Sequence, residues 1–175
     1  MSLSDSPRKI VENVDRAILY SNYKKNFEDY ILKFIGGRGE MGEIIQKHSE
    51  FGKRIILEPW VTDYERLPLM YNWGDLFLLP SIDTQIWREQ CGFAIGESLL
   101  CHVPVITSTS KSIIEIWGGT KDIQFVDAGD VDTLVSLISN PKIYTEAKEG
   151  RQFVINNYSY EKIGAKYIEA MEMVL

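Results

Sequence analysis

Short apolar runs that alternate with helical patterns are the feature that most limits how this chain can fold. The runs that read as buried strands are Tyr30–Ile35, Arg54–Leu57, Leu76–Leu79, Val103–Thr107 and Ile123–Val126. No tight hairpin turn joins them and no repeat is visible. Apolar strands connected by helices are typical of a parallel sheet covered on both faces. With right-handed crossovers, we expect an α/β fold, a Rossmann-like doubly wound parallel sheet of five or six strands.

The intervening stretches carry helical signals. Ile10, Val14 and Ala17 recur at helical spacing, which predicts an amphipathic helix from about Arg8 to about Tyr20. Thr62 and Glu65 fit a capping box for a helix that ends near Asn72. Further helices are expected at about Gly39–Glu50, Phe93–Leu100, Ser112–Gly118, Val131–Ser139, Ile143–Asn156 and Tyr160–Met173.

Length and composition fit one cytoplasmic domain. The chain has 175 residues, of which 45% are apolar, and a net charge of -6 that argues against nucleic-acid binding. Residues 1–7 look like a tag or flexible start, so residues 8–175 form the expected domain. No apolar run is long enough to span a bilayer and no signal peptide is visible. Cys91 and Cys101 give no disulfide framework, which favours a reducing compartment.

The stretch from Leu76 to Thr107 contains two of the buried strands, a polar loop and a helix that opens at Gly92. Ligands of such sheets bind at the carboxyl ends of the strands. The first amides of a helix lack intrahelical acceptors and carry partial positive charge. A glycine at the opening lets an anion approach the backbone closely. This stretch therefore predicts a phosphate site.

Two glutamates bracket the helix opening. Glu97 lies about one turn into the helix, where it could hold a sugar hydroxyl while the amides hold phosphate, as a nucleotide diphosphate would require. An ordinary buried helix, with Glu97 capped or solvated, fits the spacing equally well. Glu89 would repel phosphate, so it should face a sugar hydroxyl or an oxocarbenium-like centre. A surface ion pair with Arg88 or another basic residue is the alternative for Glu89.

Other site patterns are missing from the sequence. No cluster of His, Cys and carboxylate residues has metal-ligand spacing, and neither a Walker P-loop nor a G-x-S-x-G elbow occurs. The run Gly36–Gly39 lacks the full dinucleotide fingerprint. Trp60 lies at a strand end, where it could contact a base, although packing is the more common role.

The run from Glu89 to Glu97, E-Q-C-G-F-A-I-G-E, resembles the E-x7-E signature of retaining glycosyltransferases of the GT-B fold, in family 4 or group 1. Its surroundings are similar in order. Leu32–Gly37 resembles a family strand that ends in a glycine turn, Tyr71–Ser81 a run into a strand that ends in Pro-Ser, and Val103–Ile106 the following Pro-Val strand. The resemblance extends from about Ile31 to the C-terminus.

The resemblance implies that the chain is the C-terminal, donor-binding half of a two-domain enzyme. Glu97 would hold the donor ribose, and Glu89 would contact the transferred sugar and act in catalysis. The amides of Gly92, Phe93 and Ala94 would contact the diphosphate or the donor sugar.

The loops at Gly37 and at Trp60 and Val61 would flank the base. The donor would be a UDP- or GDP-linked sugar, transferred with retention and without a metal or cofactor. A polysaccharide or glycolipid is the expected acceptor. The site of action would be the cytoplasm or the inner face of the membrane, which only the missing N-terminal acceptor domain would touch.

Three departures from the family pattern stand out. The family's first strand, with its phosphate-gripping Arg and Lys, is expected to be missing before Tyr30. Cys91 replaces an aromatic residue and Gln90 a glycine. The acceptor domain is missing as well, so the chain alone is expected to be inactive or nearly so.

Two other functions fit parts of the pattern. A non-catalytic module that binds a nucleotide or nucleotide-sugar would explain the missing phosphate-gripping strand. A GT-B-type nucleotide-sugar epimerase would need more acidic and His residues than Ser81–Arg88 contains.

Overall fold

The computed structural model describes residues 8–13, 30–35, 55–59, 61–83, 85 and 88–173. In chain order, the elements are β1 (Arg8–Asn13), β2 (Tyr30–Ile35), β3 (Ile55–Glu58), η4 (Tyr64–Arg66), α3 (Leu67–Asn72), β4 (Leu76–Leu79), α4 (Phe93–Leu100), β5 (Val105–Ser108), α5 (Lys111–Trp117), β6 (Ile123–Val126), α6 (Val131–Ser139), η5 (Pro141–Ile143), α7 (Lys148–Tyr158) and α8 (Tyr160–Glu172).

The strands of the described residues form one six-stranded sheet in the order β3-β2-β1-β4-β5-β6. Every neighbouring pair is parallel. The strand order reverses between β1 and β4, which is the switch point where such sheets bind ligands. The predicted Rossmann-like, doubly wound parallel sheet is confirmed.

Strand β4 shows why apolar runs predicted this sheet. Leu76 and Leu78 belong to one core cluster, whereas Phe77 and Leu79 belong to the other. All four side chains are buried, because helices cover both faces of a central parallel strand.

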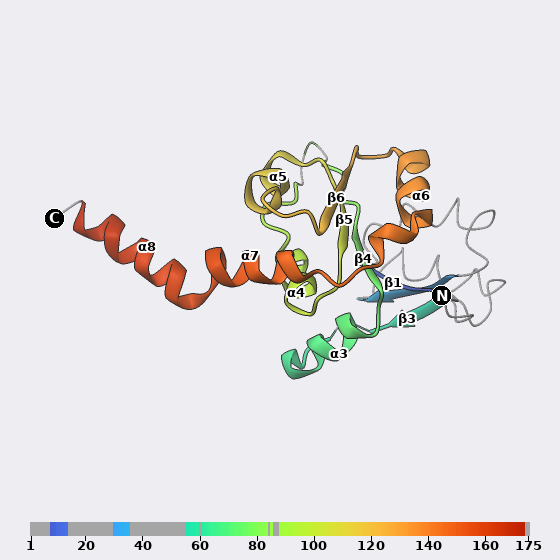
Figure 1. Cartoon of the computed structure of the whole chain (residues 1–175), viewed down its shortest axis with the longest axis horizontal. Helices are drawn as coiled ribbons and strands as arrows, with labels where there is room; N and C mark the ends of the chain where they lie inside the picture. Colours follow the sequence, from blue (N-terminus) through green and yellow to red (C-terminus); the bar gives the residue numbers. More distant parts are fainter. Residues whose placement is uncertain are drawn as a thin grey trace.

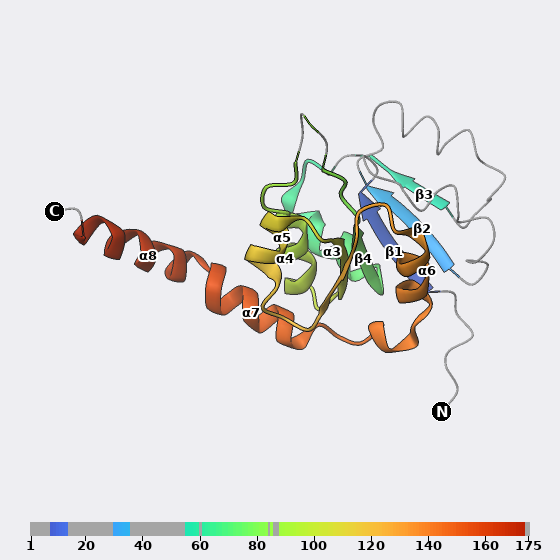
Figure 2. The same ribbon diagram turned by 90° about the horizontal axis from the view of Figure 1, so that it is seen from above.

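Helices α4, α5 and α7 cover one face of the sheet and α6 covers the other (Figures 1 and 2). Ile95 of α4, Ile113 of α5 and Val154 of α7 pack with Phe77 in one cluster. Leu134 of α6 packs in the opposite cluster. The carboxyl ends of β4, β5 and β6 are therefore held in place from both sides.

Helix α8 extends away from the sheet beyond α7 (Figures 1 and 2). It has no buried residue, and its exposed apolar side chains include Tyr160, Tyr167, Ile168 and Met171. Among the helices of the described residues, none has both the length and the apolar character needed to cross a bilayer.

The prediction of a helix from Arg8 is wrong over Arg8–Asn13, which form strand β1; residues 14–20 lie outside the described part. The strand pairs with β2 over six residues and with β4 over three. Pairing on both sides outweighs the helical spacing of the apolar residues, a long-range effect that local propensity does not report. The expectation that the family's first strand is missing before Tyr30 is therefore wrong as regards the strand, because β1 lies between β2 and β4. That it lacks phosphate-gripping Arg and Lys residues stays a prediction.

Smaller differences concern element ends. Asp63, not Thr62, caps η4: its side chain accepts a hydrogen bond from the Glu65 amide at 3.1 Å. Regular α-helix begins at Leu67, with Pro68 in its first turn. The helix predicted from Ile143 starts only at Lys148. The helix predicted at Gly39–Glu50 lies outside the described residues.

Candidate functional site

The opening of α4 lies directly after the loop that follows β4. Gly92 is its N-cap and has a left-handed backbone, with φ 57° and ψ 48°. A Cβ on Gly92 would lie 2.8 Å from Cδ1 of Ile113 and 3.1 Å from Cδ1 of Ile95. The left-handed backbone therefore favours glycine here, and an added Cβ would also force the ends of these isoleucine side chains to shift.

The amides at this opening are of two kinds. The Gly92 amide donates to Oε1 of Glu89 at 3.3 Å. Among the described residues, no oxygen accepts a hydrogen bond from the backbone amide of Phe93 or of Ala94. Phe93 is 73% exposed, so this end of the helix is open to solvent. Amides at a helix start carry partial positive charge, which makes this opening suited to an anion.

Glu89 is held through its backbone as well as its side chain. Its carbonyl oxygen accepts a hydrogen bond of 2.5 Å from the Ser112 hydroxyl on α5. The carboxylate of half-buried Glu89 covers the amide of Gly92, the N-cap residue of α4. Glu89 is thus beside the predicted anion position, and a ligand at the Gly92 amide would have to displace it.

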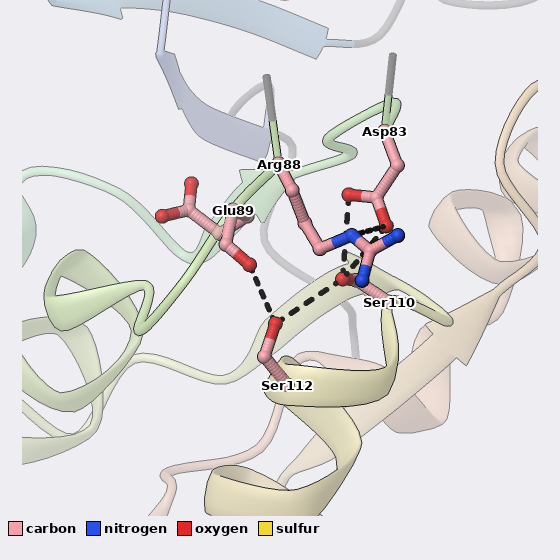
Figure 3. A network of polar contacts seen from close by, with 5 residues as sticks. All are labelled: Asp83, Arg88, Glu89, Ser110 and Ser112. Carbon is pink, nitrogen blue, oxygen red and sulfur yellow. Dashed lines mark hydrogen bonds and ion pairs between the residues drawn. The ribbon is translucent and has the colours of Figure 1, made fainter. Parts of the chain in front are cut away.

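A chain of polar contacts connects the Glu89 loop to the start of α5 (Figure 3). The Ser112 and Ser110 hydroxyls lie 3.3 Å apart. Ser110 also donates to the Asp83 carboxylate at 3.3–3.4 Å, and Nε of Arg88 lies 3.1 Å from Asp83 Oδ2. Arg88 therefore pairs with Asp83, whereas the sequence alternative paired it with Glu89.

Glu97 lies on the side of α4 that faces α3. The Tyr71 hydroxyl donates to Glu97 Oε2 at 2.8 Å. Burial, followed by the negative charge of Glu97, raises the pKa of Tyr71 above its ordinary range. Tyr71 is therefore protonated at neutral pH, as an ordinary tyrosine is, and remains so at more alkaline pH.

The predicted base-binding residues are only partly described. Val61 is half-buried and follows β3. Gly37 and Trp60 lie outside the described residues. Because β3 and β4 are separated by β2 and β1, their ends lie about 14 Å apart at ordinary strand spacing. One extended ligand could reach from Val61 to the opening of α4.

The surroundings of the two cysteines are those of packing residues, not of catalytic nucleophiles. Both are free and half-buried. The Cys91 carbonyl accepts a hydrogen bond of 2.6 Å from the Trp117 indole. Burial raises the pKa of the Cys101 thiol, which makes it a poorer nucleophile. No group of three or more His, Cys, Asp or Glu side chains in the described part of the chain is placed to hold a metal ion.

Sequence reasoning assigned no site role to Tyr71, Ser112 or Asp83, although the loops that contain Ser112 and Asp83 follow strands at the predicted ligand-binding edge. Tyr71 is 26 positions from Glu97, and Ser112 is 23 positions from Glu89. The start of α5 follows β5, the next strand of the sheet, so the predicted edge is a signal that could have pointed to Ser112. No comparable signal links Tyr71 to Glu97.

The fold is shared with solved glycosyltransferase structures. Sucrose-phosphate synthase from Thermosynechococcus elongatus is 18% identical, with a TM-score of 0.77, over 98% of this chain and 46% of that chain. HepE from Anabaena, solved with UDP and glucose, is 14% identical, with a TM-score of 0.73, over 95% of this chain and 48% of that one. A glycosyltransferase from Rickettsia africae is 18% identical, with a TM-score of 0.69, over 98% and 48%. This chain thus spans about half the length of each.

Two sequence comparisons were informative in different ways. A search of curated protein sequences finds no match, whereas a family profile does match. The profile of the family described as glycosyl transferases group 1 matches residues 6–141, which is more than half of the chain. The match includes β1 and the whole stretch from β4 to the start of α5. The chain belongs to the group 1 glycosyltransferases.

Proposed function

We propose that this chain is the donor-binding half of a glycosyltransferase, which holds a UDP- or GDP-linked sugar for retaining transfer without a metal ion. A polysaccharide or glycolipid, bound by another domain, is the proposed acceptor. The observation that carries the proposal is the opening of α4: an anion-suited helix end at Gly92, flanked by Glu89 and Glu97.

The diphosphate would bind at the Phe93 and Ala94 amides, which have no acceptor among the described residues. In the reaction, the bond from the sugar C1 to the diphosphate oxygen breaks, a bond from C1 to an acceptor hydroxyl oxygen forms, and the proton of that hydroxyl passes to the departing diphosphate or to water. The departing diphosphate takes the negative charge. Amides at a helix N-terminus stabilise this charge as it develops.

Glu89 would meet the transferred sugar. Its carboxylate lies at the amide of the N-cap residue Gly92, next to the position proposed for the phosphates. A carboxylate there can stabilise positive charge at C1 or hold a sugar hydroxyl. The Ser112 bond to its backbone supports this role, because it holds the loop beside the helix opening.

The nucleoside would lie between α4 and the end of β3. Glu97 would accept hydrogen bonds from the ribose hydroxyls, and the loops at Val61, Trp60 and Gly37 would flank the base. A nucleotide has base, ribose and phosphates in a row, which suits a site that extends from the end of β3 toward that of β4, about 14 Å away at ordinary strand spacing. HepE, whose fold matches, has been solved with UDP-glucose, and this supports the ligand class.

A second, acceptor-binding half is proposed because the chain spans about half of the matched structures. The exposed apolar residues of α8, among them Tyr167 and Ile168, are consistent with such a partner. Transfer activity would require both halves.

Titration calorimetry with UDP, GDP and ADP tests the donor site in this chain. We expect one of the three to bind, and Glu97→Ala to weaken that binding about tenfold or more, because a bond to a charged group is lost. Glu169→Ala on α8 is the matched control, since it removes an exposed carboxylate far along the chain. Failure of all three nucleotides to bind at millimolar concentration would contradict the proposal.

A further inference from the structure

Tyr71 makes the only hydrogen bond that reaches the Glu97 carboxylate from the described residues, at 2.8 Å. The bond engages Oε2. Oε1 accepts no hydrogen bond from the described part of the chain, and Glu97 is only half-buried. The carboxylate therefore has one anchored oxygen and one that can receive a ligand.

The Tyr71 side chain is held rigidly by its surroundings. Tyr71 is 6% exposed and lies in the core cluster beneath α4. Its ring packs edge-on against Phe77 of β4, with centroids 5.4 Å apart and an interplanar angle of 76°. A ring clamped in this way has one position for its hydroxyl, so the sheet determines where Glu97 is held.

We propose that Tyr71 is a positioning residue, which fixes the Glu97 carboxylate so that its second oxygen is presented to the donor ribose. The inference rests on the proposed function, because it assigns Glu97 to the ribose. Without the phenol hydroxyl, the Glu97 side chain would rotate freely in the unbound chain. Fixing it when the ribose binds would then cost conformational entropy and lower the affinity.

Tyr71→Phe tests the proposal, because it keeps the packed ring and removes only the hydroxyl. With the nucleoside diphosphate that the wild-type chain binds, we expect affinity to fall roughly five- to tenfold. The 2′,3′-dideoxy form of that nucleotide lacks the hydroxyls that Glu97 would receive. Its affinity should be the same for Tyr71→Phe and for the wild type.

Tyr144→Phe is the matched control. Its hydroxyl donates to the Ile138 carbonyl at 2.7 Å, and the ring packs on the opposite face of the sheet. This variant loses a hydrogen bond of similar length and should keep the wild-type affinity for both nucleotides.

A double-variant comparison removes any effect of general destabilisation. If Tyr71 acts through Glu97, Tyr71→Phe should change nothing further in a Glu97→Ala background. Equal losses for the ribo- and dideoxynucleotides would overturn the positioning role. So would an unchanged Tyr71→Phe affinity where Glu97→Ala weakens binding, and in that case the proposed function stands. A wild-type chain that binds no nucleotide would overturn both.

Discussion

The indole ring of Trp117 lies directly against Gly96, where a Cβ would come within 2.7 Å of ring atom Cη2. The same ring donates from Nε1 to the Cys91 carbonyl at 2.6 Å, and Trp117 is 4% exposed. One α5 side chain therefore supports both the α4 helix and the loop before it. The helix opening at Gly92 depends on this close packing.

Gly96→Ala should destabilise the chain by about 1–3 kcal/mol, because a buried indole cannot move away from the added methyl group. Urea unfolding monitored by circular dichroism measures the effect. Gly164→Ala is the control: a methyl group added at this α8 position would meet nothing within 4 Å, so the alanine should stabilise that helix by up to about 1 kcal/mol. Equal effects at both positions would contradict the packing explanation.

Gly92→Ala combines two costs, a left-handed backbone and close contacts with Ile113 and Ile95. Gly129→Ala has the first cost alone, since its φ is +85° and nothing lies within 4 Å. A left-handed alanine costs about 1–2 kcal/mol, and overpacking adds about 1–3 kcal/mol at Gly92. The unfolding free energy should therefore fall further for Gly92→Ala. If Gly129→Ala is as damaging, the contacts at Gly92 are unimportant.

Ser112→Ala should cost about 1 kcal/mol of unfolding free energy, because it removes the hydrogen bond to the Glu89 carbonyl. It should also weaken binding of a nucleotide-sugar more than binding of the bare nucleotide, since Glu89 is assigned to the sugar. Calorimetry with both ligands measures that ratio. Thr109→Val, which removes an exposed bond to Asp127, should leave the ratio unchanged.

Alkaline pH should reduce the stability difference between the wild-type chain and Tyr71→Phe. Burial raises the pKa of Tyr71 in the folded state, so the unfolded chain loses this proton first as pH rises. The contribution of Tyr71 is complete below about pH 10 and decreases above it, by about 1 kcal/mol at pH 11. Urea unfolding from pH 8 to pH 11 measures it, and a constant difference across that range would contradict the burial effect.

A chain that ends after Tyr158 should keep its stability to within about 1 kcal/mol, because no α8 residue is buried. Truncation before Val154, which is 6% exposed in the core, should cost several times more. Thermal unfolding of the two truncated chains compares them. A large loss on removing α8 alone would show that its apolar side chains are covered in solution.

Several elements could be predicted from the sequence because their signals are local. Strands at Tyr30–Ile35, Leu76–Leu79 and Ile123–Val126 have the predicted bounds, since each is a short apolar run ended by turn residues. Ser159 caps α8, with its hydroxyl accepting from the Lys162 amide. The opening of α4 at Gly92 is also as predicted, since a glycine there follows a polar loop and precedes an apolar helical run.

The first strand shows where local signals fail. Arg8–Asn13 contain apolar residues whose spacing continues into a helical pattern, yet they pair with β2 and β4. Backbone pairing with strands far along the chain outweighs the local preference. The capping of η4 by Asp63 instead of Thr62 is a similar case on a smaller scale, because either side chain can accept the same amide.

The sequence by itself determined the parallel sheet, the helix opening at Gly92 and the two glutamates with seven residues between them. Each depends on neighbours in the chain, through apolar patterning, turn chemistry and helix geometry. Only the tertiary structure decided how the glutamates are held: Glu97 by Tyr71, and Glu89 by Ser112 and the Gly92 amide. These contacts join segments more than twenty residues apart, except at Gly92. They exist because packing on one sheet brings α3, α4 and α5 together.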